Sequence, residues 1–165
     1  MKEFLIMAFA NNAGLIVFLH VLGAVIWVGG MIALRFAVHP AIHLLEDPKV
    51  RLARVLQIMG GFFNIVLPFI VVLLLTAILM IVGLDFKNGD PSLYTLTHVK
   101  EGIWVVMAIN FGLMYQRRRK AQQRFLSGDL EGAKALMVPI QRYQIPVNIF
   151  LGVLAIYFGV VLRGF

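Results

Sequence analysis

The sequence has no cysteine among its 165 residues. Disulfide bonds, iron–sulfur clusters and thiolate metal sites are therefore excluded, because each of them is built from cysteine sulfur. Charge is also scarce, since 14% of the residues are charged and only 8 of them are Asp or Glu. Soluble domains carry about 25% charged residues. The chain is therefore not an ordinary soluble domain.

Apolar residues take the place of charge: they make up 61% of the chain, and the mean hydropathy is +0.89. A membrane span needs about 20 mostly apolar residues. Four segments meet this length, at about 13–38, 59–84, 96–115 and 145–162. Runs this continuous in so short a chain form helices rather than a barrel. The sequence predicts one all-α domain over 1–165, an integral membrane four-helix bundle.

Two further segments flank these runs. The apolar stretch at 4–10 predicts a short interfacial helix, with cleavage as a signal peptide as the alternative. Asn11 or Asn12 then caps the first span. The most polar segment, about 116–144, predicts a helical connector on the cytoplasmic side, into which the third and fourth spans extend.

The basic residues predict an orientation. Eleven lie in the segments that follow the first and third spans, and four lie on the opposite side. By the positive-inside rule, both termini and the segment 85–97 face outward, and the location is a bacterial inner membrane crossed several times. Because topology accounts for the RRRK run at 117–120, lipid is the expected partner and nucleic acid is not.

His20 lies inside the first apolar run, where an ionisable side chain marks function by default. Its helical face also carries Gly23, Trp27 and Gly30. Two interpretations remain open. The small residues allow close helix packing, with His20 bonded to a neighbour. Alternatively, they leave room for a flat macrocycle whose iron His20 ligates.

His98 lies near the start of the third run, on the same side of the membrane as His20. Facing histidines on two helices are what axial ligation of a b-type heme requires, although His98 could also simply cap its helix. Glu101 falls about 60° from His98 around the helix and would orient its imidazole. Lys100 falls about 160° away and points outward, or meets a heme propionate if it faces the bundle.

Other polar residues in the apolar runs have plainer interpretations. His39 and His43 are expected to be exposed at the inner interface rather than to bind a metal. Asn64, Asn110 and Asn148 are expected to form hydrogen bonds between helices.

Two stretches resemble known families. HVLGAVIWVGGMIALRFAVHPA, at 20–41, resembles the first-helix pattern of the copper-resistance protein D (CopD) family. THVKEGIWVVM, at 97–107, is similar to the third-helix His-x-Lys motif of HemJ-type protoporphyrinogen oxidases, which bind heme b. The resemblance implies that His20 is a heme ligand and that His98 and Lys100 are the His-x-Lys pair.

The leading hypothesis is a heme b-binding membrane protein with a redox role. His20 and His98 would ligate the iron, and Gly23, Trp27, Lys100 and Glu101 would complete the site. The role would be electron transfer to or from quinone, or oxidation of a porphyrinogen substrate. The alternatives are copper transport or resistance through His20, His98 and Met31 or Met107, and a structural subunit of a membrane complex. Assembly as a homo-oligomer stays open.

Overall fold

The computed structural model describes residues 2–84 and 91–163, and they form four long helical rods without a strand. The bounds of their segments, including three π-helical ones, follow in chain order. The first rod comprises α1 (Lys2–Ala24), η1 (Val25–Gly29), α2 (Gly30–Ala33), η2 (Leu34–Val38) and α3 (His39–His43); the second is α4 (Pro48–Gly83), the third α5 (Pro91–Leu126), and the last comprises α6 (Leu130–Pro139), η4 (Ile140–Gln144) and α7 (Ile145–Val161). The all-α prediction is confirmed.

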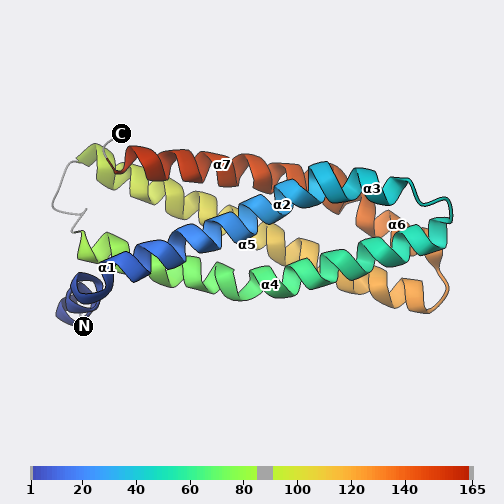
Figure 1. The fold of residues 1–165 in the computed structure, drawn as a ribbon, viewed down its shortest axis with the longest axis horizontal. Coiled ribbons are helices and arrows are strands. Elements are labelled where there is room, and N and C mark those ends of the chain that lie inside the picture. The colour runs from blue at the N-terminus through green and yellow to red at the C-terminus, as the bar shows by residue number, and fades with distance from the viewer. Residues whose placement is uncertain (1, 85–90, 164–165) are drawn as a thin grey trace.

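The four rods close into a bundle (Figure 1). α1 packs along α4, α4 contacts α5, α5 contacts α7, and α7 in turn meets η1 and α2. The described chain begins and finishes at one end of the bundle, called here the terminal end. The α3–α4 and α5–α6 turns lie at the opposite end, called here the basic end. The first and third rods are therefore diagonal, as the placement of His20 and His98 had assumed.

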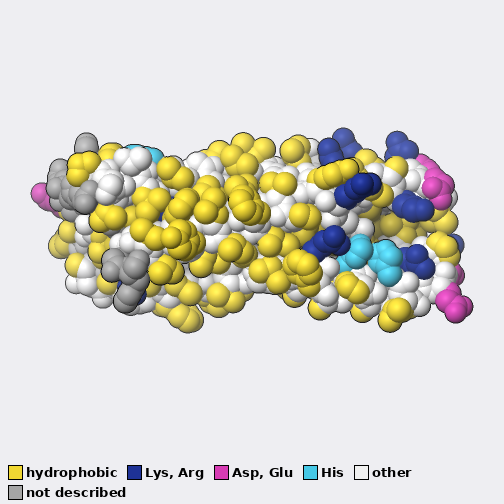
Figure 2. Space-filling view, turned by 90° about the horizontal axis from the view of Figure 1, so that it is seen from above, with side chains coloured by type: hydrophobic (Ala, Val, Ile, Leu, Met, Phe, Trp, Pro, Cys, Tyr) yellow, Lys and Arg dark blue, Asp and Glu magenta, His cyan; other side chains and the backbone are white. Residues whose placement is uncertain are grey.

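The surface matches a lipid environment along the middle of the bundle. Apolar side chains such as Val71, Ile109 and Phe150 are exposed there, and Figure 2 shows basic side chains gathered toward the basic end. Three helical stretches are long and apolar enough to cross a membrane: Glu3–His43, Pro48–Gly83 and Leu130–Val161. The prediction of four spans is thus supported for three, because α5 carries charged residues close to both ends of its apolar stretch.

The helices extend beyond the spans predicted for them. Asn12 has non-helical backbone angles (φ −133°, ψ 22°), which separate a short first helix from the first span as the sequence indicated. The third helix begins at Pro91 and continues to Leu126, so it extends into the polar segment at 116–144 as the sequence predicted. Hydropathy locates the ends of an apolar run, whereas the helices of this chain continue beyond those ends. The predicted outer segment falls partly on 85–90, outside the described residues.

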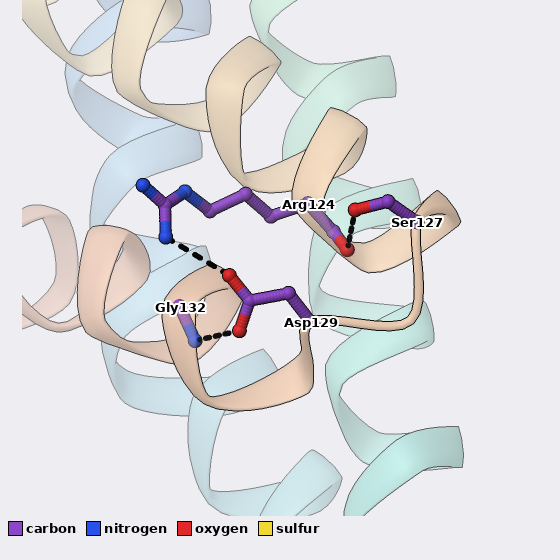
Figure 3. A network of polar contacts seen from close by, with 4 residues as sticks. All are labelled: Arg124, Ser127, Asp129 and Gly132. Carbon is purple, nitrogen blue, oxygen red and sulfur yellow. Dashed lines mark hydrogen bonds and ion pairs between the residues drawn. The ribbon is translucent and has the colours of Figure 1, made fainter.

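The α5–α6 turn is one of the two that return the chain at the basic end (Figure 3). Gly128 has φ +86°, a left-handed conformation that costs glycine little. The Asp129 carboxylate accepts from the Gly132 N–H at 2.8 Å and caps α6. Arg124 Nη1 donates to the same carboxylate at 2.9 Å, and the Ser127 hydroxyl donates to the Arg124 carbonyl. Glycine and these bonds fix where α5 ends and α6 begins.

This turn should make stability depend on pH in acid. The Gly132 N–H and the Arg124 guanidinium lower the pKa of Asp129, so the folded state binds fewer protons than the unfolded state near that pKa. The stabilisation is present above the unfolded-state pKa and lost as pH falls through the lower folded-state pKa. Thermal unfolding followed by circular dichroism should show a smaller acid loss for Asp129→Asn, which keeps the cap but does not titrate.

Candidate functional site

The buried face of the first rod carries His20. Ile16, Gly23, Trp27 and Met31 are all buried, and their spacing of seven, four and four residues places them on one helical stripe. His20 lies on this stripe and is half-buried. The helix therefore turns His20 toward the bundle, and α4 is its main neighbour.

Thr76 of α4 is the partner of His20. Its Oγ1 lies 2.9 Å from His20 Nδ1, and the hydroxyl also donates to the Val72 carbonyl at 2.7 Å. A hydroxyl has one hydrogen, so when Thr76 donates it to the Val72 carbonyl it accepts from His20 Nδ1–H. In that arrangement the imidazole is in the tautomer whose Nε2 carries a lone pair.

Lys100 of α5 approaches the same region. Its Nζ lies 3.0 Å from the position that a Cβ on Gly159 of α7 would occupy, so the side chain is laid against the last rod. Its charge acts on the His20 ring. Within the described ranges, no carboxylate lies within ion-pair distance of Lys100. The His20–Thr76 bond thus joins the first rod to α4, and the Lys100–Gly159 contact joins α5 to α7, both toward the terminal end.

His98 does not join this site. Its Nδ1 lies 2.7 Å from Glu101 Oε2, and the two side chains are 54% and 47% exposed. Its ring also packs edge-on against Tyr94, with 4.5 Å between centroids. The expected pairing with Glu101 is therefore present, but the expected meeting with His20 is not. Residues two apart on a helix point in nearly opposite directions, so Lys100 faces inward where His98 faces outward.

The small residues of the first rod serve close packing. A Cβ on Gly23 would come 2.9 Å from the side chain of Leu73, and a Cβ on Gly30 would strike the ring of Phe62. Trp27 is 1% exposed and stacks edge-on with Phe111 at 6.0 Å. Neither Gly23 nor Trp27 leaves an open face for a macrocycle, because side chains of α4 and α5 fill it. Gly23 and Gly30 thus allow α4 to pack closely against the first rod.

The residues considered as copper ligands do not lie together. Met31 and Met107 are 0% and 4% exposed in the core, and no described contact joins either of them to His20. His43 is exposed as expected, and its ring lies 4.2 Å from that of His39. No group of three or more His, Asp or Glu side chains among the residues described could hold a metal ion.

A separate polar network lies deeper in the bundle. Asn110 donates to Asn148 Oδ1 at 2.8 Å and to the Gln144 carbonyl at 2.9 Å, and Gln144 Nε2 donates back to Asn110 Oδ1 at 2.9 Å. Asn148 also donates to the Met107 carbonyl. The prediction of interhelical bonds is confirmed for Asn110 and Asn148. It is wrong for Asn64, whose exposed side chain makes no such bond in the described structure.

Sequence reasoning gave no role to Thr76, although it is a hydroxyl residue within the apolar run at 59–84. Lys100 continues the spacing of Thr97, Ile103 and Met107, which the structure shows to be buried, but equally apolar residues of α5 are exposed, so the sequence alone does not give its inward direction. No protein-family model matches the chain, and neither the curated proteins nor the solved structures contain a match.

Proposed function

We propose that this protein binds heme b within a membrane and has a redox role, with His20 as the protein ligand. The observation that carries the proposal is the Thr76 bond to His20 Nδ1, because it fixes the tautomer whose Nε2 can donate to iron. Ligating histidines in proteins characteristically donate their other N–H to an oxygen in this way. The resemblance of the stretch at 97–107 to a family that binds heme b supports the same group.

Lys100 supports the proposal with charge. Its ammonium has no carboxylate partner among the described residues and lies in electrostatic range of His20. A cation in such a place is costly unless an anion compensates it. A heme propionate has the required charge. The His20–Lys100 pair therefore replaces the His20–His98 pair expected from the sequence.

The fit of the group rests on these two side chains and not on the Gly23–Trp27 face, which is filled by packing. A heme held there would supply one-electron chemistry, suited to electron exchange with quinone or to porphyrinogen oxidation. His20 would bind the group, Thr76 would orient the imidazole, and Lys100 would hold the charged edge.

The proposal includes a place and an orientation. The basic residues at the α3–α4 and α5–α6 turns favour a cytoplasmic position for the basic end. The His20–Lys100 site then lies in the outer half of a bacterial inner membrane, with both termini outside.

Visible absorption of protein purified from heme-replete cells tests the proposal, which expects a Soret band and reducible alpha and beta bands. Lys100→Met should weaken heme retention about 10–100-fold, the effect of losing a charge-assisted bond. Lys134→Met removes the same charge from an exposed site on α6 and should leave retention unchanged. A colourless wild type would overturn the proposal, and equal loss in both variants would remove the role of Lys100.

A further inference from the structure

A hollow of about 440 Å³ opens between α4 and α5 toward the basic end. Its walls include a guanidinium and three side-chain amides, from Arg118, Gln57, Asn64 and Gln122. It is called here the Arg118 hollow. No part of the proposed heme site contributes to it.

The depth of the Arg118 hollow corresponds to a headgroup layer. Arg118 lies against Gly60, where a Cβ would collide with its guanidinium. From Gly60 to Gly83, near the terminal end of α4, the helix rises about 35 Å at about 1.5 Å per residue. The hydrocarbon core is about 30 Å thick. Arg118 therefore lies at the boundary between hydrocarbon and headgroups on the basic side.

The Arg118 guanidinium keeps an unpaired charge and unused hydrogen-bond donors within the described structure. Nε and Nη2 donate to the Leu56 carbonyl at 3.1 and 2.8 Å, and Nη2 also donates to Gln122 Oε1 at 3.3 Å. These bonds position the guanidinium without neutralising it. No carboxylate in the described structure forms an ion pair with Arg118, and the Nη1 N–H groups have no bond to the described protein. A guanidinium so fixed is a receptor for phosphate oxygens.

The amides of α4 add neutral partners. The Asn64 side chain is exposed in the described structure and makes no hydrogen bond there. Pro68 also has no N–H to give to the Asn64 backbone carbonyl. Gln57 uses its oxygen to accept from Arg54 Nη1 at 2.9 Å, which leaves its NH₂ group available. Amides turned toward lipid tails without partners are costly, whereas headgroup oxygens would satisfy them.

We propose that the Arg118 hollow binds the phosphate of an anionic phospholipid, with Arg118 as the charged contact and Gln57 and Asn64 as amide contacts. A second copy of the chain fits less well, because a two-fold contact would set one Arg118 opposite the other. The net charge of +7 also favours an anionic occupant over another copy. Basic hollows at this depth on the cytoplasmic side are suited to such headgroups.

Native mass spectrometry of the detergent-solubilised full chain tests this, with phosphatidylglycerol and phosphatidylcholine as probes. The wild type should retain phosphatidylglycerol in preference, and Arg118→Gln should lower that retention at least about tenfold. Arg119→Gln removes the same charge from the next residue, which is exposed, and should retain the lipid. Equal losses in the two variants would mean general attraction to a basic end and would overturn the site.

Further measurements test the amide contact and distinguish phospholipid from free phosphate and from a second copy of the chain. Asn64→Leu leaves the Arg118–Leu56 bonds in place and should still weaken phosphatidylglycerol retention, so it decides the matter if Arg118→Gln fails to fold. Retention unchanged in Asn64→Leu would overturn the amide contact. Inorganic phosphate in excess should not displace the lipid, and displacement would assign the hollow to free phosphate. A dimer that excludes lipid would assign it to a second copy.

Discussion

His20→Ala should abolish the Soret band of the purified protein, while His98→Ala should keep it. His20 Nδ1 is held by Thr76 and its Nε2 is the only heme donor that the site offers among the described residues. The His98 side chain is 54% exposed, and its Nδ1 lies at hydrogen-bond distance from Glu101 Oε2. The measurement is heme content per protein, from the Soret absorbance, for both variants expressed under the same heme supply.

Thr76→Val provides the matched test of the hydrogen bond. Valine keeps the shape of threonine and removes the hydroxyl that accepts from His20 Nδ1. Loss of a partner of this kind costs about 10–100-fold in metal affinity, so the variant should bind heme weakly rather than not at all. A His98→Ala variant as colourless as His20→Ala would instead restore the pair of histidines and show that Lys100 is not the inward group.

Far-UV circular dichroism of each variant separates lost ligation from lost folding. A His20→Ala protein that keeps its helical signal without the Soret band has lost a ligand. If His20→Ala retains the band, the imidazole serves only to link α1 to α4 through Thr76. The cost would then be that of one interhelical bond, about 1–2 kcal/mol.

The helical bundle could be predicted from the sequence because a membrane helix needs a long apolar run, and such runs are easily recognised in a sequence. The sequence also predicted that the segments after the first and third runs share one end, because the basic residues gather in both, and the α3–α4 and α5–α6 turns do lie together. The start of α5 at Pro91 could not be predicted in this way, because hydropathy places that span at about 96–115. At its other end the helix continues through the charged residues of the connector, as the sequence predicted, and ends at Leu126 before the turn at Gly128.

The inward faces of the helices were harder to predict. In a soluble helix, polar residues mark the outer face, but exposed positions of α5 such as Val105 and Ile109 are as apolar as the buried Ile103. The face of α5 was therefore inferred from His98, the residue with the most familiar chemistry. The spacing of Lys100 from Thr97 and Met107 carried the better information, and only the position of α7 beside it shows which residue faces inward.

The Arg118 hollow could not be predicted from the sequence, for a related reason. Arg118 belongs to the RRRK run, which topology explains without reference to any single side chain. Only the packing of α4 against α5 distinguishes Arg118, bonded to the Leu56 carbonyl, from the exposed Arg119.

Asn110→Leu should lower the free energy of unfolding in detergent by about 2–4 kcal/mol. The substitution removes three hydrogen bonds and leaves the buried side chains of Gln144 and Asn148 short of partners. Asn64→Leu is the matched control, because it replaces an exposed amide that makes no such bond in the described structure and should change stability little. Denaturant titration followed by circular dichroism measures both.

The pair Asn110 and Asn148 also predicts coupling. Each single leucine substitution leaves one buried polar atom of the other amide without its partner, since Asn110 Nδ2 donates to Asn148 Oδ1 at 2.8 Å. Substituting both removes donor and acceptor together, so the double variant should lose less free energy of unfolding than the two single variants added together. Additive losses would mean that the two amides act separately, and that the contact between α5 and α7 is held by apolar packing alone.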